Sequence, residues 1–299
     1  MTSKNINDTI YLDKDIDITL IQSKKVTILG YGNQGRAQAL NLKDSGVDVT
    51  IALREGSKSF KAAEKDGFKC DFIKDAVLDA DIVCFLIPDQ HMAPTYEKEV
   101  KGNLKFNATL LFSHGYNIHY RLIEPDSNYN IVMVAPSGPG DIVRKKYLQN
   151  SGVPNLIAVY QSATPDALDI TLSYSKAIGG TRVCAFASTF KEETETDLFG
   201  EQVVLTGSFP RIIKESFKVL LEGGYSPVVA WFVCFYEVKN IVDLFSDKGI
   251  DYMFRAVSET AEYGGQTRAD RLIDDDVAEE MNEILKEIKS GEFHKEWME

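Results

Sequence analysis

Residues 25–35 read KVTILGYGNQG, a β-branched apolar run that leads directly into three closely spaced glycines. The run predicts a short buried strand, and the helical spacing of the residues after it predicts a helix. In such a strand–turn–helix, Gly30 would make the tight turn, Gly32 would let backbone N–H groups approach a pyrophosphate, and Gly35 would let the helix pack on the strand. The stretch therefore predicts a dinucleotide-binding unit.

Beyond this unit, apolar β-branched runs alternate with segments of helical spacing as far as residue 187, and from Thr189 onward only helical spacing is found. The pattern predicts a Rossmann domain with a doubly wound parallel sheet in residues 1–188 and an all-α domain in residues 189–299. The helix expected after Pro227 is apolar on nearly all sides, which suits burial at an oligomer interface. Further strands are expected at residues 48–53, 81–87, 108–113, 131–135, 155–160 and 182–187.

The composition excludes several classes of partner. The 299 residues carry a formal net charge of −12, so nucleic acid and anionic membranes would repel the chain. The first residues lack the apolar run of a signal peptide, and no segment approaches the roughly 18 apolar residues of a membrane span. We therefore expect a cytoplasmic protein. The four cysteines are scattered, which indicates reduced thiols, not a disulfide framework or a zinc site.

The second expected strand ends at Leu53, about where an NAD-binding domain has an acidic residue for the ribose hydroxyls. The chain continues instead with Arg54, followed by Ser57 and Ser59. A guanidinium with two hydroxyls nearby can hold the 2′-phosphate of NADP. The alternative is a charged surface turn in which Ser57 caps the next helix, and Glu55 keeps that alternative open. We favour NADP as the cofactor.

Two polar groups follow later strands. His114 comes after the strand at 108–113, and Ser137 lies in the turn after the strand at 131–135. Ligands of open α/β sheets bind beyond the carboxyl ends of the strands, so both residues are expected at the nicotinamide crevice. A lone histidine is more often structural, whereas a strand-end position favours a functional role, and both interpretations stay open for His114.

Residues 189–202 read TFKEETETDLFGEQ and hold five acidic residues. On a helix, Glu193 and Asp197 share one face, as do Asp197 and Glu201. Such a face can hold a divalent cation through oxygen ligands. The alternative is a solvated helix start, where acidic side chains suit the helix dipole.

Together these stretches resemble the class I (short-form) ketol-acid reductoisomerases of branched-chain amino-acid synthesis. The resemblance covers essentially the whole chain, and residues 189–202 are its most specific motif. It implies a Rossmann domain, an intertwined and knotted helical dimerisation domain, a homodimer with shared active sites, NADPH and two Mg²⁺ ions. The family reaction moves an alkyl group in a 2-acetohydroxy acid and then reduces the resulting 2-keto group.

The resemblance also implies roles for single residues. His114 matches the active-site histidine, and Asp197 and Glu201 match carboxylates that hold magnesium. Glu237 matches the second glutamate of the partner helix. Ser258 matches a serine that contacts the substrate carboxylate.

The chain departs from the family pattern at several positions. Ser137 stands where the family has a lysine, and Val233 stands where it has the first glutamate of the partner helix. Arg36 and Gln38 replace histidines that are common in the family, and residues 265–268 differ after the substrate serine.

The first two departures bear on the chemistry, because alkyl migration needs metal ions to generate and template charge. Val233 removes one anionic metal ligand, so the site at Asp197 and Glu201 is expected to be weakened or absent, and Mg²⁺ is an uncertain cofactor. Ser137 removes a cation and can only hydrogen-bond. We therefore expect an NADPH-dependent reductase that has lost alkyl migration and acts on a small imine or 2-keto acid. An iminium would be favoured by Asp197, Glu201 and Glu237.

Two alternatives stay open, a functional Mg²⁺-dependent ketol-acid reductoisomerase and a non-enzymatic cofactor-binding protein. The candidate catalytic residues are His114, Ser137, Asp197, Glu201 and Glu237, and the candidate substrate contacts are Val233 and Ser258. The candidate cofactor contacts are Gly30, Tyr31, Gly32, Asn33, Gln34, Gly35, Arg54, Ser57, Ser59, Pro88 and Gly140.

Overall fold

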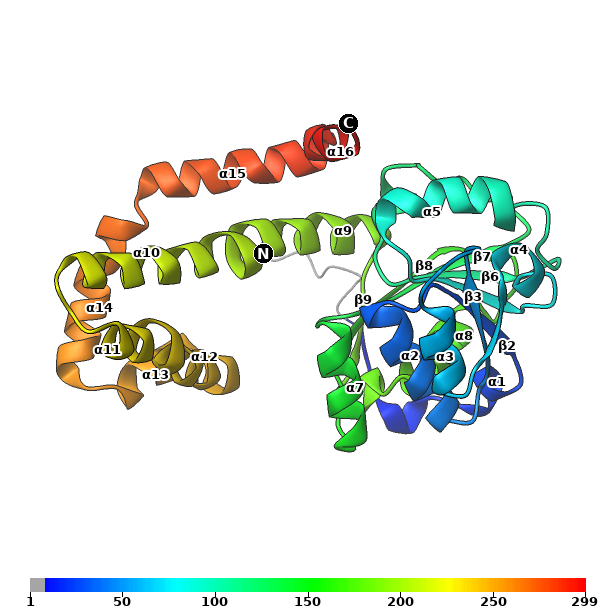
Figure 1. Ribbon diagram of the computed structural model, residues 1–299, viewed down its shortest axis with the longest axis horizontal. Coiled ribbons are helices and arrows are strands. Elements are labelled where there is room, and N and C mark those ends of the chain that lie inside the picture. The colour runs from blue at the N-terminus through cyan, green and yellow to red at the C-terminus, as the bar shows by residue number, and fades with distance from the viewer. Residues whose placement is uncertain (1–8) are drawn as a thin grey trace. The chain divides into compact units, whose positions relative to one another are not determined.

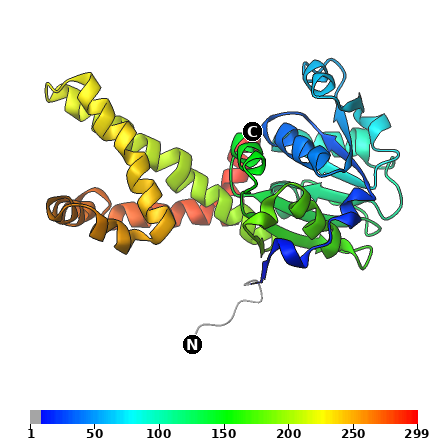
Figure 2. The same ribbon diagram turned by 90° about the horizontal axis from the view of Figure 1, so that it is seen from below.

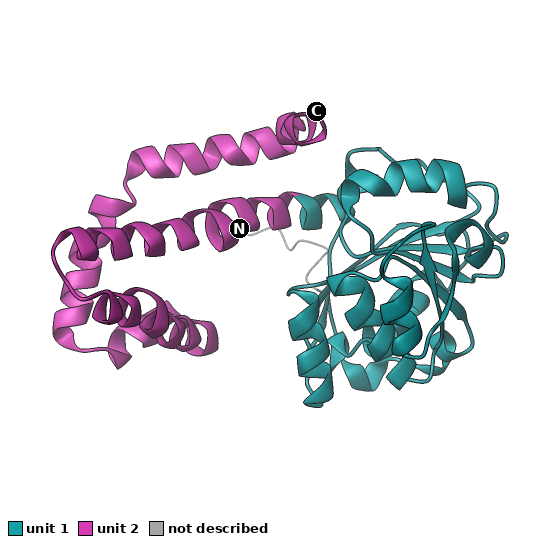
Figure 3. Cartoon of the chain, in the orientation of Figure 1, with its two compact units in different colours: residues 1–194 teal, residues 195–299 magenta. Residues whose placement is uncertain are grey.

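The computed structural model describes residues 9–299. The chain divides into two compact units, residues 1–194 and residues 195–299 (Figure 3). This division falls six residues after the expected domain boundary at 188/189. It lies inside the helix α9 (Phe190–Phe199), which begins in the first unit and ends in the second. Each unit is described separately below.

A sheet forms the centre of the first unit (Figure 1). It has nine strands in the order β1-β9-β8-β7-β6-β5-β2-β3-β4. The strands are β1 (Ile10–Tyr11), β2 (Lys25–Leu29), β3 (Asp48–Leu53), β4 (Lys69–Phe72), β5 (Ile82–Phe85), β6 (Thr109–Phe112), β7 (Asn130–Pro136), β8 (Asn155–Gln161) and β9 (Ala185–Ala187). The order reverses between β2 and β5, because β2 pairs with β3 on one side and with β5 on the other. A ligand crevice is expected beyond the carboxyl ends of the strands at such a reversal.

The sheet is parallel from β4 through β7 but not throughout. β8 runs antiparallel to β7, and β1 runs antiparallel to β9. In the β7–β8 pair, Pro136 lies opposite Asn155, so the chain leaves β7 and enters β8 at the same edge of the sheet. The expected Rossmann architecture is confirmed, whereas an all-parallel sheet is corrected, and β1 and β4 are strands that the sequence pattern did not indicate.

Helices cover both faces of the sheet, as Figures 1 and 2 show. One buried apolar cluster joins the sheet to helices on one face, and a second cluster joins it to helices on the other. Both strand faces are apolar because both are covered, as in doubly wound folds. The first face carries α1 (Thr19–Gln22), α2 (Asn33–Asp44), α3 (Phe60–Lys65) and α8 (Ala167–Ala177), and the second carries α4 (Ile73–Ala76), α5 (Asp89–Thr95) and α6 (Tyr116–His119). Helix α7 (Gly140–Leu148) packs against α2.

The second unit is helical, as expected. Its helices are α10 (Phe209–Glu222), α11 (Pro227–Trp231), α12 (Glu237–Lys248), α13 (Ile250–Ala256), α14 (Glu259–Leu272), α15 (Asp275–Ser290) and α16 (Glu292–Met298). Two π-helical segments, η4 (Gly200–Ser208) and η5 (Phe232–Tyr236), interrupt the α-helical pattern. Between residues 9 and 299, no helix combines the length and apolar character that crossing a bilayer requires.

Candidate active site

The turn after β2 has the geometry that its glycines predict. Gly30 has φ +94°, and a Cβ there would lie 2.7 Å from Ile87 Cγ2. A Cβ on Gly35 would lie 2.7 Å from the Gly30 carbonyl oxygen, so helix and turn are in contact. Gly32, which caps α2, has nothing within 4 Å of its Cβ position. Its backbone therefore borders open space at a helix N-terminus, which fits a pyrophosphate.

A cavity of about 380 Å³ adjoins this turn. It is lined by predicted cofactor residues from three strand ends, namely Gly30, Tyr31, Gly32, Arg54, Ser57, Ser59 and Pro88, and also by His91, Thr95 and Glu99. Arg54 comes directly after β3, and the Ser57 hydroxyl accepts a hydrogen bond from the Ser59 N–H at 3.3 Å. The residues present thus fit the adenosine half of a dinucleotide.

Four other predicted cofactor residues do not line this cavity, and one of them is Gly35, which packs against the Gly30 carbonyl. Asn33 and Gly140 line a second cavity of about 680 Å³ between α2 and α7. Gln34 donates from Nε2 to the Gly138 carbonyl at 2.8 Å, so its side chain is engaged with the protein.

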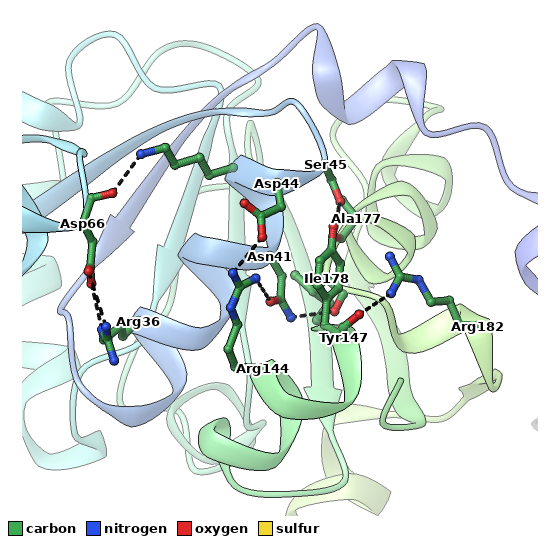
Figure 4. Close-up of polar contacts among 11 residues, drawn as sticks. Arg36, Asn41, Asp44, Ser45, Asp66, Arg144, Tyr147, Ala177, Ile178 and Arg182 are labelled. Carbon is green, nitrogen blue, oxygen red and sulfur yellow. Dashed lines mark hydrogen bonds and ion pairs between the residues drawn. The ribbon is translucent and has the colours of Figure 1, made fainter. Parts of the chain in front are cut away.

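Hydrogen bonds to Asp66 connect the glycine turn to the start of α2. The Tyr31 hydroxyl donates to Asp66 Oδ2 at 2.7 Å. Arg36 Nε donates to the same oxygen at 2.8 Å, and Figure 4 shows this pair. The hydrogen bonds from Arg36 and Tyr31 hold the pKa of Asp66 below its usual value, and burial and the bond to Asp66 raise the pKa of Tyr31. Arg36, noted in the sequence as a departure from the family pattern, therefore braces the cofactor turn.

His114 lies two residues beyond β6, beside a buried carboxylate. Its Nδ1 is 2.9 Å from Glu193 Oε1, and the Gly115 N–H donates to Glu193 Oε2 at 2.7 Å. Glu193 is only 3% exposed. A carboxylate at Nδ1 favours the neutral tautomer with its proton on Nδ1 and a lone pair on Nε2, and it stabilises the protonated ring. Glu193 thus fixes the orientation of the His114 ring.

Helix α9 carries this carboxylate and the first predicted metal ligand. Asp197 follows Glu193 by one turn, and ligand atoms of His114, Glu193 and Asp197 all lie within 4.8 Å of one another. A nitrogen and two carboxylates form a donor set that fits a divalent cation. Glu193 was not among the candidate site residues, although its position on one helical face with Asp197 was a signal that could have found it.

Glu201, the second predicted metal ligand, lies in η4. The Thr206 hydroxyl donates to the Glu201 carbonyl at 2.7 Å, a spacing of five residues that accompanies the π-helical turn. Short π-helical segments are frequent at functional sites, and Val233 lies in η5, the second such segment of the helical unit.

Ser137 is exposed in the turn after β7, and its N–H donates to the Pro154 carbonyl at 2.9 Å. The nearest basic residue along the chain, Arg144, is engaged on α2. It pairs with Asp44 at 2.7 Å and donates to Asn41 Oδ1 at 2.8 Å (Figure 4). Because its guanidinium is bound to Asp44 and Asn41, Arg144 does not replace the lysine that the family pattern has at position 137.

The remaining predicted residues belong to the helical unit. Val233 and Glu237 are both exposed there, and Val233 has 49% of its surface accessible. Ser258 caps α14, with its hydroxyl accepting from the Ala261 N–H at 3.2 Å. A capping role accounts for the serine structurally, and its predicted contact with substrate stays a prediction.

Comparison with known proteins bears on the whole chain. The family model described as acetohydroxy acid isomeroreductase, NADPH-binding domain, matches residues 20–184, and that described as ketol-acid reductoisomerase, C-terminal domain, matches residues 190–299. The chain belongs to the ketol-acid reductoisomerase family. Its assignment as an NAD(P)H-dependent oxidoreductase is thereby confirmed, and the non-enzymatic alternative is set aside.

Among solved structures, the chain resembles an NADH-preferring ketol-acid reductoisomerase from an uncultured archaeon, with 40% identity and a TM-score of 0.93 over 97% of this chain and 89% of that one. A semialdehyde dehydrogenase NAD-binding protein from Cupriavidus necator matches with 16% identity and a TM-score of 0.69 over 90% and 99% of the two chains. A pyrroline-5-carboxylate reductase from Coxiella burnetii matches with 13% identity and a TM-score of 0.61 over 90% and 98%. The last two show the fold alone.

Proposed function

We propose that this member of the ketol-acid reductoisomerase family is an NADPH-dependent reductase that acts on the C=N or C=O bond of a small imine or 2-keto acid and does not carry out alkyl migration. The observation that carries the proposal is the pair of departures at Ser137 and Val233. Alkyl migration needs a deprotonated tertiary alcohol beside a polarised carbonyl, which two metal ions provide. A missing anionic ligand and a missing cation both weaken that arrangement.

Reduction asks less of the protein. A bound nicotinamide supplies hydride to the carbon of the acceptor, and the protein supplies position and a proton. His114, protonated and stabilised by Glu193, would give its proton to the oxygen of a 2-keto acid as the C=O bond becomes an alcohol. An iminium carries its positive charge already, and Asp197, Glu201 and Glu237 would attract it.

The proposal includes one metal ion in place of the family's two. The donor set of His114, Glu193 and Asp197 fits one divalent cation only when His114 is neutral, and a bound cation would then polarise the acceptor oxygen in place of proton donation by His114. The second ion loses a ligand at Val233.

A homodimer with shared active sites and an intertwined helical domain also stays a prediction, consistent with the exposed apolar side chains of α11 and η5 in the second unit.

A second candidate is a functional Mg²⁺-dependent ketol-acid reductoisomerase. It is favoured by the 40% identity to the archaeal ketol-acid reductoisomerase and by the presence of His114, Asp197 and Glu201. In that case Arg268 of α14 would compensate for the lost lysine.

One assay separates the two. We expect NADPH oxidation with cyclic imines or 2-keto acids to exceed that with 2-acetolactate and Mg²⁺ by about 10²-fold or more, because loss of a metal ligand or its support costs at least 10–100-fold. The initial rate of NADPH oxidation, followed by absorbance at 340 nm, measures turnover of each substrate. Brisk 2-acetolactate turnover that is unaffected by Ser137→Lys and Val233→Glu would establish the second candidate instead.

We further propose NADPH over NADH, because Arg54, Ser57 and Ser59 line the adenosine cavity at the end of β3. Arg54→Ala should raise the KM for NADPH about 10–100-fold and leave the KM for NADH within about twofold, since a charge-assisted hydrogen bond to a phosphate is worth about 1.5–3 kcal/mol. Lys61→Ala, an exposed cation on α3 outside the cavity lining, is the matched control. Equal effects of Arg54→Ala on both cofactors would contradict the assignment.

A further inference from the structure

The buried side-chain amide of Gln38 lies between the cofactor helix α2 and the loop that carries His114. Gln38 of α2 is completely buried. Its Nε2 donates to Gln34 Oε1 at 3.1 Å and to the Ser113 hydroxyl at 3.0 Å, and its Oε1 accepts from the Tyr174 hydroxyl at 2.8 Å. Both amide donors and the carbonyl are therefore in use.

The two groups that receive these donors lie on different elements, because Ser113 follows β6 whereas Gln34 is on α2 itself. Ser113 directly precedes His114 at the end of β6. Gln34 in turn donates to the carbonyl of Gly138, the residue after Ser137 at the end of β7. Gln38 thus bonds directly to the loop after β6, and it is linked to the loop after β7 through Gln34.

The network leaves little freedom to these loops. Gln38 is completely buried and has no water to replace a lost partner, so displacement of Ser113 or Gln34 would leave its amide unsatisfied. Gly140, at the start of α7, reinforces the placement because a Cβ there would lie 2.2 Å from the Asn33 carbonyl oxygen. The loop after β7 is therefore pinned to α2 at two points.

We propose that Gln38 is a positioning residue, which holds the His114 loop and the Ser137 loop in register with the cofactor turn so that the nicotinamide side of the site is formed before NADPH binds. The role deepens the proposed function and rests on it for its catalytic consequence. Its consequence for cofactor affinity does not depend on the substrate.

All members of the network are neutral. The titratable groups that face Gln38 are Tyr174 and, next to Tyr174, Cys84. Burial raises the pKa of Cys84 to about 12 and raises that of Tyr174 well above its ordinary value. The hydrogen bonds therefore persist through the physiological pH range in the native chain.

The test uses Gln38→Glu, which keeps the shape and removes both amide donors. A carboxylate at this position cannot donate to the Gln34 carbonyl oxygen, whereas the protonated acid donates one hydrogen bond, and burial raises the pKa of such an acid. We expect the Kd for NADPH to rise about tenfold or more at pH 8 and to recover as the pH falls below about 6, because affinity falls with the fraction of assembled sites. Gln38→Met, which has no donor at any pH, should show the loss without the recovery.

Asn41→Asp is the matched control. Asn41 is also fully buried on α2, but it bonds the Ile178 carbonyl at 2.9 Å and Arg144 (Figure 4), not a strand-end loop. It should lower thermal stability and leave NADPH affinity and its pH profile unchanged.

The measurements are NADPH binding by fluorescence and hydrogen exchange of segments 114–119 and 138–142 in the full chain. Faster exchange in both segments, in the Gln38 variants alone, supports the proposal. Native affinity and exchange in Gln38→Met and Gln38→Glu, or the same change in Asn41→Asp, would overturn it. Neither measurement uses a substrate. If the chain proves to catalyse alkyl migration, the proposed function is wrong, but the proposed role of Gln38 is unaffected.

Discussion

Replacing His114 with glutamine lowers kcat for reduction of a 2-keto acid by about 10²–10⁴-fold, the usual range for loss of a general acid. The alkoxide that forms after hydride transfer must take a proton, and the imidazole oriented by Glu193 is the group proposed to give it. Glutamine is of similar size and has no titratable proton. The effect is measured as kcat for NADPH oxidation at saturating substrate, with the Kd for NADPH measured separately and expected to change less than threefold.

The same substitution distinguishes the two substrate classes. An iminium needs no proton when it accepts hydride, so His114→Gln should lower kcat for a cyclic iminium by less than about tenfold. His119→Gln on α6 is the control, because it removes another histidine of the same unit. Equal losses in the two variants, or none with a 2-keto acid, would remove His114 from its proposed role.

The fold could be predicted largely from local pattern. The run at 25–35 has a β-branched strand, a glycine turn and a helix because each of its residues suits its own backbone conformation, and Gly30 at φ +94° is the clearest case. The direction of β8 could not be predicted in this way. It depends on the pairing of Pro136 with Asn155, which no periodicity within either strand encodes.

The site was predictable where function leaves a local motif and not where it depends on long-range contacts. The cavity brings Arg54, Ser57 and Ser59 together with the glycine turn because successive strand ends meet at one edge of the sheet. Gln38 gave no such signal, because its partners Ser113 and Tyr174 are 75 and 136 residues away in the chain. In the sequence it was only a departure from a family pattern.

A second large effect is expected for Glu193→Gln. The carboxylate accepts from both His114 Nδ1 and the Gly115 N–H, and a glutamine has only one carbonyl oxygen for the two donors. One of them loses its partner in a buried place. We expect kcat to fall about 10–100-fold, as for other groups that orient a functional histidine, and stability to fall by about 2–3 kcal/mol. Thermal unfolding and turnover measure the two effects, and Glu192→Gln, on the exposed side of the same helix, should change neither.

Glu193→Asp then distinguishes the effect of the negative charge from the effect of the hydrogen bond to His114. Helix α9 already lies against the backbone at Gly115, where an added Cβ would be 2.5 Å from Thr194 Oγ1 and 2.6 Å from the Phe190 carbonyl oxygen, so it has little room to approach further and make up for the missing methylene. The aspartate keeps the negative charge but falls short of His114. If orientation of the imidazole is what matters, Glu193→Asp loses about as much kcat as Glu193→Gln. If the charge alone is sufficient, the aspartate restores most of the rate, and the assignment of Glu193 as a positioning residue is wrong.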